Sequence, residues 1–135
     1  MGIILSQVVV DSRDPASLAA WWGEVLGREV EADGEDEIWI VGESPGDLEL
    51  GFIRVPEDKT VKNRLHIDLR PQDGSDQATE LERLIALGAR RVDVGQGPDV
   101  TWVVLADPEG NEFCLLRSTP AEVAADMAAA ESLPG

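Results

Sequence analysis

Residues 64–70 read RLHIDLR, and residues 71–76, which follow directly, read PQDGSD. Apolar and polar side chains alternate through the first stretch, which predicts a strand. The second stretch is polar, and its aspartates and serine are typical of the segment before a helix. The predicted helix begins at about residue 76 and ends at Leu87-Gly88, because glycine readily adopts the backbone that terminates helices.

The first half of the chain follows the same plan. Residues 3–11, IILSQVVVD, are rich in β-branched side chains and predict a strand. Asp14 and Pro15 then mark a helix start, because the carboxylate caps free backbone N–H groups and proline suits the first turn. This helix also ends at a Leu-Gly pair, Leu26-Gly27.

Three more strands are predicted after each helix. They span 28–32, 37–42 and 48–55 in the first half and 90–94, 101–106 and 112–117 in the second. Each half is therefore β-α-β-β-β, and this internal repetition decides the architecture. One such module leaves a face of its sheet uncovered. Two modules predict an α+β fold in which eight strands form a curved mixed sheet, with helices outside and a groove inside.

We expect these modules to form a single domain over residues 1–118. The modules span about 3–56 and 62–118, and an alanine-rich tail at 119–135 is expected to be helical. A chain of 135 residues is long enough for one hydrophobic core.

The chain is strongly acidic: 27 acidic residues against 11 basic ones give a formal net charge of −16. Nucleic-acid phosphates and anionic membrane surfaces repel so negative a protein, so neither is an expected partner, whereas cationic small molecules are attracted. The single cysteine, Cys114, excludes a disulfide within the chain, and the first fifteen residues lack the basic region of a signal peptide. The sequence therefore predicts a cytoplasmic protein.

Several short motifs accompany the repeat. LGREV follows the first helix, HIDL opens the second module, and DPEGNEF lies near the end; RVPEDKTVKNRLHIDL and DPEGNEFCLL are the longest of these stretches. With the paired modules, they resemble the vicinal oxygen chelate superfamily over about residues 3–118, in particular its small glyoxalase-like proteins. That superfamily includes glyoxalase I, bleomycin-resistance proteins, methylmalonyl-CoA epimerase and extradiol dioxygenases. The resemblance implies the fold more strongly than a function, because this fold hosts several chemistries.

Alternation along the strands predicts which side chains face the groove. The expected core positions of two strands are Leu65, Ile67 and Leu69, and Leu48, Leu50 and Phe52. Arg64, His66, Asp68 and Arg70 then point to the groove, as do Glu49, Gly51 and Ile53. His66, the only histidine of the chain, is thus expected away from the core.

In metal-binding members of the superfamily, four strand positions supply the ligands. The resemblance carries these positions to Gln7, Glu49, His66 and Cys114, and the repeat pairs Gln7 with His66 and Glu49 with Cys114. The first three match the ligand types of glyoxalase I, and their donors suit Zn, Ni, Mn or Fe(II). The resemblance thus implies a metal site of Gln7, Glu49 and His66, with Glu49 and His66 also catalytic.

Cys114 departs from this pattern, because the resemblance calls for a glutamate that both binds the metal and moves the substrate proton. A thiolate binds zinc well, whereas a lone cysteine in an apolar run such as EFCLLR is more often a packing residue. We therefore expect glyoxalase I activity to be weak or absent.

Other groove or ligand-binding positions are predicted as well. They are Cys114, Asp68, Arg64, Trp39 and Trp102. The two tryptophans lie on middle strands, where each either packs in the core or stacks on a ligand.

Two functions from different classes remain open. One is a divalent-metal-dependent lyase or isomerase acting on a small carbonyl substrate. The other is a metal-free protein of the bleomycin-resistance type that sequesters a cationic small molecule. A regulatory module with an empty groove has no positive feature in its favour.

A second copy of the chain is the expected protein partner, because superfamily members usually cover exposed sheet edges with a second subunit. Val123, Met127 and Leu133 of the tail are expected to add apolar contact. The groove closes either within one chain or by exchange between two.

Overall fold

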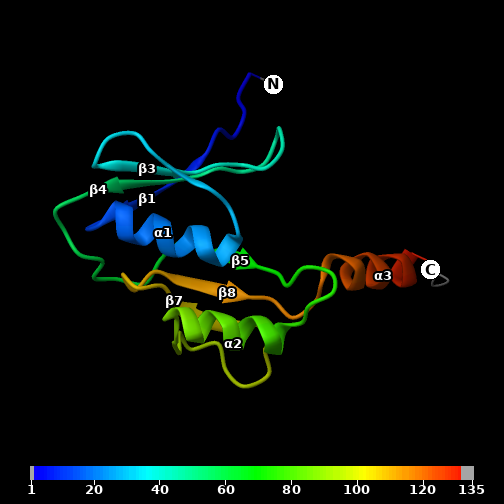
Figure 1. Cartoon of the computed structure of the whole chain (residues 1–135). Coiled ribbons are helices and arrows are strands. Elements are labelled where there is room, and N and C mark those ends of the chain that lie inside the picture. Colours follow the sequence, from blue (N-terminus) through cyan, green and yellow to red (C-terminus); the bar gives the residue numbers. More distant parts are fainter. Residues whose placement is uncertain (1, 132–135) are drawn as a thin grey trace. The chain divides into compact units, whose positions relative to one another are not determined.

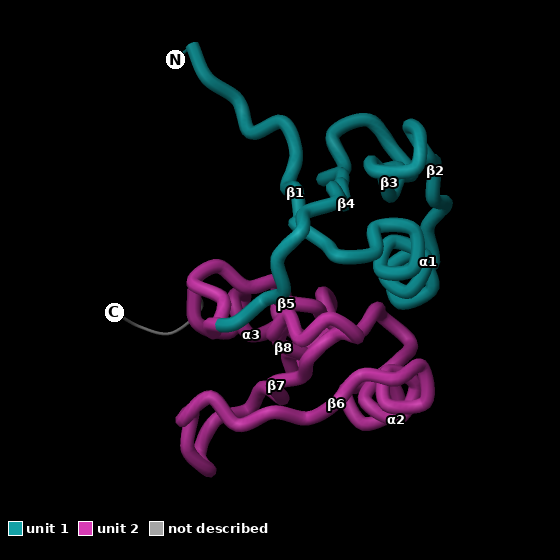
Figure 2. Tube along the Cα trace, turned by 90° about the vertical axis from the view of Figure 1, so that its left-hand side faces the viewer, with its two compact units in different colours: residues 1–60 teal, residues 61–135 magenta. Residues whose placement is uncertain are grey.

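The computed structural model describes residues 2–131. The chain forms two compact units, the first ending at Thr60 and the second beginning at Val61 (Figure 2). Each unit contains one mixed four-stranded sheet, with a helix between its first two strands (Figure 1). The predicted α+β class and the two β-α-β-β-β modules are confirmed, and the eight strands are divided equally between two sheets.

Unit 1 follows the predicted element order. It contains β1 (Val8–Ser12), α1 (Pro15–Leu26), β2 (Val30–Ala32), β3 (Glu37–Ile40) and β4 (Leu50–Arg54). The strand order in the sheet is β1-β4-β3-β2, with β1 parallel to β4 and the other pairs antiparallel. The Asp14 side chain accepts a hydrogen bond from the Ser17 backbone N–H, and Gly27, with φ of 64°, ends the helix. The helix bounds therefore follow from the capping residues.

The core of unit 1 lies between α1 and one face of its sheet. Leu18 and Trp22 of α1 are buried with Ile40 and Phe52 of the strands. Gly51 points to the other face, where the Trp39 indole lies so close that a Cβ atom on Gly51 would come within 2.6 Å of the ring. Glycine is required at this position because Trp39 fills the space of its side chain.

Unit 2 repeats the arrangement and adds a terminal helix. It contains β5 (Ile67–Leu69), α2 (Gln77–Leu87), β6 (Arg90–Arg91), β7 (Val103–Ala106), β8 (Glu112–Leu115) and α3 (Pro120–Glu131). The strand order, β5-β8-β7-β6, is that of unit 1, and β5 and β8 are the parallel pair. The same order in both sheets is the structural counterpart of the sequence repeat.

In unit 2, α2 lies against its sheet (Figures 1 and 2). Leu84 of α2 is fully buried, as are Leu105, Phe113 and Leu115 of the strands. Asp76 caps the helix by accepting a hydrogen bond of 2.8 Å from the Thr79 N–H. This bond lowers the pKa of Asp76, because it favours the charged carboxylate.

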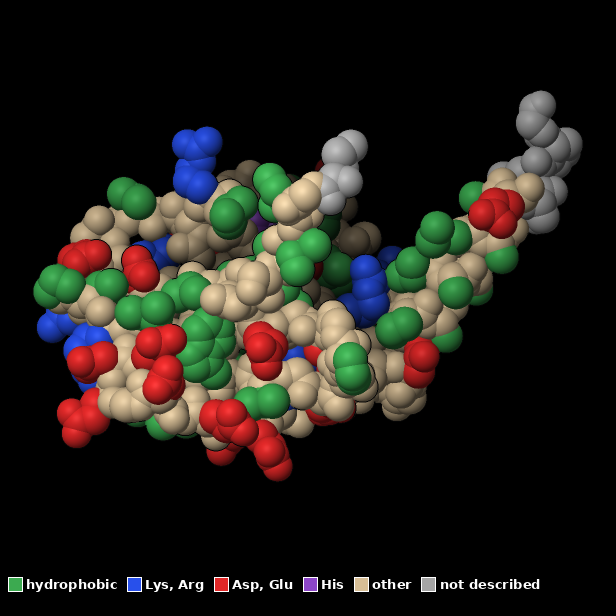
Figure 3. Space-filling view, turned by 90° about the horizontal axis from the view of Figure 1, so that it is seen from above, with side chains coloured by type: hydrophobic (Ala, Val, Ile, Leu, Met, Phe, Trp, Pro, Cys, Tyr) green, Lys and Arg blue, Asp and Glu red, His purple; other side chains and the backbone are tan. Residues whose placement is uncertain are grey.

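Helix α3 is fixed at its start but buries none of its residues. Thr119 and Glu122 form a reciprocal capping box, and Asp73 accepts from the Ala121 N–H at 2.9 Å. Small apolar side chains line much of its exposed length (Figure 3). None of the helices within residues 2–131 is both long and apolar enough to cross a membrane.

The predicted core faces are wrong at two strand ends. Leu65 is 90% exposed and Leu48 is 46% exposed. Both residues precede the paired part of their strands, since β5 begins at Ile67 and β4 at Leu50. Alternation between two faces holds only where neighbouring strands fix the backbone, so it does not apply to these leucines.

Candidate metal and small-molecule site

Strand register in unit 2 gathers polar side chains on one face of its sheet. Asp68 of β5 is the register partner of Cys114 of β8, and Cys114 is in turn the partner of Val104 of β7. His66 precedes Asp68 by two residues and therefore lies on the same face. The opposite face is the buried one that carries Phe113. The predicted orientation of His66 away from the core is thus explained by the pleat.

His66 and Asp68 contact each other directly on this face. The His66 Nδ1 atom lies 3.0 Å from Asp68 Oδ1, and both side chains are about half exposed. A carboxylate only accepts hydrogen bonds, so this contact assigns the proton of the neutral imidazole to Nδ1. The lone pair on Nε2 is then available to bind a ligand or to accept a proton.

Cys114 is the buried member of the cluster and is 8% exposed. Burial raises the pKa of its thiol, and the negative charge and hydrogen bond of Asp68 raise it further. One donor atom from each of His66, Asp68 and Cys114 lies within 4.8 Å of the others. Nitrogen, oxygen and sulfur donors therefore meet in one small volume.

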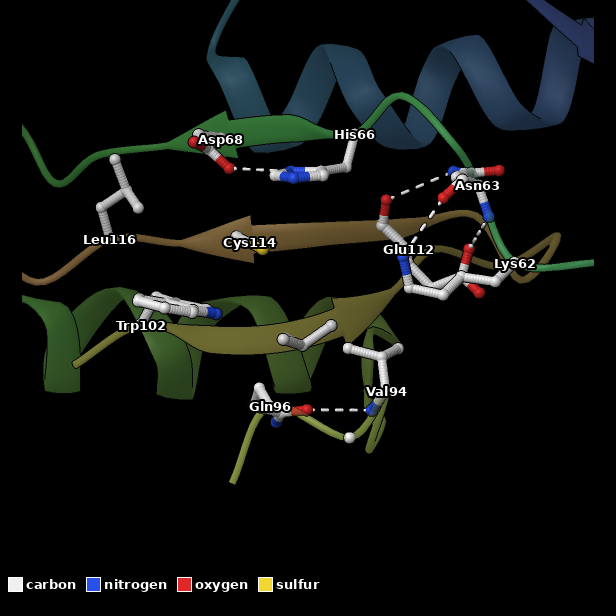
Figure 4. Close-up of a pocket in the computed structure, with 12 residues that line it drawn as sticks. Lys62, Asn63, His66, Asp68, Val94, Gln96, Trp102, Glu112, Cys114 and Leu116 are labelled. Carbon is white, nitrogen blue, oxygen red and sulfur yellow. Dashed lines mark hydrogen bonds and ion pairs between the residues drawn. The ribbon is translucent and has the colours of Figure 1, made fainter. Parts of the chain in front are cut away.

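These three residues form part of the wall of a pocket of about 530 Å³ built from unit 2 residues (Figure 4). The lining residues are Lys62, Asn63, His66, Asp68, Val94, Gly95, Gln96, Trp102, Val104, Glu112, Cys114 and Leu116. Its apolar lining residues include Trp102, which is 39% exposed, and Leu116. The pocket combines an apolar surface with one group of convergent donors, as small-molecule sites do.

One end of the pocket is held by hydrogen bonds between Asn63 and Glu112. The Asn63 backbone N–H donates to Glu112 Oε1 at 2.9 Å, and Asn63 Nδ2 donates to the Glu112 carbonyl oxygen at 3.3 Å. Lys62, beside Asn63, is the cationic residue among the lining side chains. Glu112 thus fixes the segment that leads into β5.

The predicted site residues of unit 1 lie beside one another at the start of β1 and β4. Gln7 immediately precedes β1, and the Val8 N–H donates to the Glu49 carbonyl oxygen at 3.2 Å. The Glu49 carboxylate accepts a long hydrogen bond of 3.4 Å from the Gly42 N–H. The convergence of Gln7 and Glu49 with His66 on one ion stays a prediction.

Two further predicted groove residues lie away from the unit 2 pocket. Trp39 is half-buried in unit 1, where its Nε1 donates to Glu37 at 3.0 Å. Arg64 is exposed and is not among the described residues that line the pocket. Of the predicted groove positions, the structure therefore brings His66, Asp68, Trp102 and Cys114 together.

The register changes the expected equivalence between the modules. Val8 pairs with Leu50, and Ile67 pairs with Phe113. When the two sheets are compared by this register, Gln7 and His66 occupy equivalent positions. Gly51 is then the equivalent of Cys114, and Glu49 is the equivalent of Glu112. The pairing of Glu49 with Cys114 expected from the repeat is wrong by two residues. Both glutamates accept a backbone N–H within their own unit, which is the shared feature of this position.

A profile of the glyoxalase-like domain matches residues 7–116, which is most of the chain. The chain belongs to the glyoxalase-like domain family. The resemblance to the vicinal oxygen chelate superfamily is thereby confirmed. No curated protein has significant sequence similarity to this glyoxalase-like chain.

Solved structures with the same fold include fosfomycin-resistance proteins. FosX from Mesorhizobium loti is 20% identical, with a TM-score of 0.63 over 93% of this chain and 99% of the other. FosX from Listeria monocytogenes, complexed with Mn(II) and sulfate, is 18% identical, with a TM-score of 0.69 over 94% and 99%. A glyoxalase/bleomycin resistance protein/dioxygenase family enzyme from Burkholderia phytofirmans is 18% identical, with a TM-score of 0.60 over 82% and 94%. At these identities the likeness supports the fold alone.

Sequence reasoning missed eight of the twelve residues that line the pocket of this glyoxalase-like chain. Alternation from Cys114 along β8 would have identified Glu112 and Leu116, since they lie two residues away on either side. Residues 94–96 belong to an irregular loop in which Gln96 accepts from the Val94 N–H. No periodic signal marks such a loop, because its path depends on local hydrogen bonds.

Proposed function

We propose that this glyoxalase-like chain binds a small molecule and, with a divalent metal ion, acts as a lyase or isomerase on a small carbonyl substrate. The observation that carries the proposal is the position of His66, which supplies an imidazole to a donor cluster in the wall of a largely apolar pocket. Family membership supports a ligand-binding role at this face. The FosX structure with Mn(II) supports a metal in a related protein.

The donor chemistry fits a divalent ion. The proposed ligands are the Gln7 amide oxygen, the Glu49 carboxylate and the His66 imidazole, which are donors that Zn, Ni, Mn and Fe(II) all accept. The Asp68 contact leaves Nε2 of the imidazole for this purpose. A bound divalent ion would supply Lewis-acid polarisation of a substrate carbonyl oxygen.

The protein residues would position the substrate and handle the proton. The apolar wall around Trp102 excludes water from one side of the pocket, and Lys62 offers a positive charge to an anionic substituent. Glu49 is proposed as the base, because Cys114 stands where the resemblance calls for a glutamate. Asp68 orients the His66 ring and fixes its tautomer.

Metal analysis and kinetics on one preparation test this proposal. Protein purified without a chelator or affinity tag is expected to contain about one divalent ion per active site and to turn over a small carbonyl substrate. His66→Ala should remove the metal and abolish most of the turnover, because the Lewis acid that polarises the carbonyl is lost with the ion. Robust turnover that survives His66→Ala would place the chemistry elsewhere and contradict the proposal.

A metal-free sequestration protein for a cationic small molecule is the second candidate. The pocket favours it by combining the Asp68 carboxylate with the exposed indole of Trp102, two groups that attract cations. Titration with a cationic aromatic dye in the presence of a chelator separates the candidates. Sequestration is supported if the dye binds tightly to the wild-type protein and more weakly to Trp102→Leu, and if no metal-dependent turnover is observed.

We also propose that the protein is a cytoplasmic homodimer. The single cysteine supports a reducing compartment. The exposed side chains of Ile3, Ile4 and Leu5, next to the edge strand β1, support a subunit contact.

A further inference from the structure

His66, Asp68 and Cys114 form a set of three different donors on adjoining strands. Among residues 2–131 they are the group of histidine, cysteine and acidic side chains whose donor atoms converge closely enough to hold an ion. All three line the same pocket, and Figure 4 places the Cys114 sulfur beneath the His66–Asp68 pair. Imidazole, carboxylate and thiolate are each established ligand types for zinc.

We infer that the Cys114 thiolate and the Asp68 carboxylate bind the metal ion together with His66, and that this set selects a thiophilic ion such as Zn(II). The inference rests on the proposed function in taking a divalent ion to bind at His66. It replaces Gln7 and Glu49 with two donors that belong to the same unit as the histidine. Cys114 is then a ligand rather than a packing residue.

The distances allow this assignment with a small contraction. Bonds of about 2.0–2.3 Å at tetrahedral angles separate ligand atoms by about 3.3–3.8 Å. The donors now lie within 4.8 Å of one another, so the cluster must close by about 1 Å. The side chains of His66 and Asp68 are about half exposed, whereas Cys114 is buried in a central strand. The two outer side chains can therefore move onto an ion held at the sulfur.

Glu112 and Glu49, two other carboxylates that could supply an oxygen ligand to the ion, both have hydrogen-bond partners elsewhere. Glu112 accepts the Asn63 N–H at 2.9 Å, and Glu49 accepts the Gly42 N–H at 3.4 Å. Asp68, by contrast, has its carboxylate against His66 and beside Cys114. In this chain the aspartate two residues after the histidine therefore supplies the negative oxygen donor.

A thiolate changes which ion is preferred. Sulfur ligands favour zinc over manganese, whose preferred donors are carboxylates, carbonyls and water. Three protein ligands also leave one tetrahedral position open toward the pocket, as in catalytic zinc sites. The related FosX structure contains Mn(II), so the two proteins are expected to differ in metal preference.

Titration of the full chain with Co(II), followed by absorption spectroscopy, tests the inference. A thiolate bound to Co(II) gives a sulfur-to-metal charge-transfer band in the near ultraviolet, which nitrogen and oxygen ligands do not give. We expect this band at one equivalent of Co(II), its loss in Cys114→Ser, and weakening of Co(II) binding by at least about 10–100-fold in Asp68→Asn. Zn(II) should displace the Co(II), and an equal concentration of Mn(II) should not.

Matched variants separate the two ligand sets. Glu82→Gln, on the exposed side of α2, removes one negative charge and should leave Co(II) binding unchanged. Glu49→Gln should leave the charge-transfer band in place. Circular dichroism of each variant establishes that the fold is retained.

Each outcome decides between the proposals. This inference is overturned if Co(II) binds without the charge-transfer band, and if that binding survives Asp68→Asn but is lost in Glu49→Gln. The metal-dependent function would then stand with Gln7, Glu49 and His66 as its ligands. The band together with absent carbonyl turnover keeps the inference and overturns the proposed reaction. Absence of any Co(II) binding overturns both.

Discussion

Asp68 is the register partner of Cys114 in the parallel pair of β5 and β8, and both side chains face the same pocket. Burial raises the pKa of the Cys114 thiol, and the Asp68 carboxylate that the pairing puts beside the sulfur atom raises it further. The properties of the thiol at this face therefore depend on the residues at positions 68 and 114. Substitution of residue 114 tests this dependence directly.

Cys114→Glu is expected to raise turnover of the hemithioacetal of methylglyoxal and glutathione above that of the wild-type protein, whose activity should be very weak. The new carboxylate would both bind the metal and accept the substrate proton. Steady-state kinetics with added divalent metal measure the gain. Cys114→Gln has a similar shape without the acid, so equal rates in the two variants would show that the carboxylate is not the cause.

The protein is expected to be a dimer in solution. Two subunits would cover the apolar residues near β1, and Val123 and Met127 of α3 would add to the contact; Met127 is 61% exposed, and Leu133 lies outside the described residues. Multi-angle light scattering at micromolar concentration should return twice the chain mass of 14.6 kDa. A single 14.6 kDa species over the whole concentration range would refute the dimer.

Gly51→Ala is expected to destabilise the fold by about 1–3 kcal/mol, because the new methyl group would press against the Trp39 ring. Chemical denaturation measures the free energy of unfolding. The double variant Gly51→Ala with Trp39→Leu should lose less stability than the sum of the two single variants, since the smaller side chain makes room for the methyl group. Strict additivity would indicate that the two positions do not interact.

Asp76→Ala is expected to lower the melting temperature at neutral pH by removing the cap of α2. The pKa of Asp76 is lowered from its ordinary value of 3.8 in the folded protein, so its contribution is fully present above that value and is lost as the pH falls through the lowered pKa. The difference in melting temperature between wild type and variant should therefore shrink in acid. Asn also caps helices but does not titrate. The difference in melting temperature between Asp76→Asn and Asp76→Ala should therefore not change with pH.

The module repeat and helix bounds could be predicted because they depend on local signals. Asp14, Gly27, Asp76 and Gly88 act within one turn of the helix ends they define. Alternation also placed His66 and Asp68 on one face. These features need no knowledge of how distant segments pair.

Strand register could not be predicted in the same way. The sequence alone does not say that Asp68 rather than His66 lies opposite Cys114, because register is set by pairing between residues about 46 positions apart. The exposed leucines at 48 and 65 were mispredicted for a related reason, since the paired length of each strand depends on its neighbours. Beyond the paired part of a strand, the alternation of apolar and polar residues no longer predicts which face of the sheet a side chain occupies.

The donor cluster joins a central strand of the unit 2 sheet to an edge strand of the same sheet. Cys114 is in β8, which is paired on both sides, whereas Asp68 is in β5, an edge strand of three residues, and His66 precedes it. Detachment of so short an edge breaks few ladder bonds, and such local openings are the least costly in a folded protein. One opening event would carry the imidazole and the carboxylate away while the sulfur remained in place. The residence time of anything held by all three groups would then be set by the fraying rate of β5.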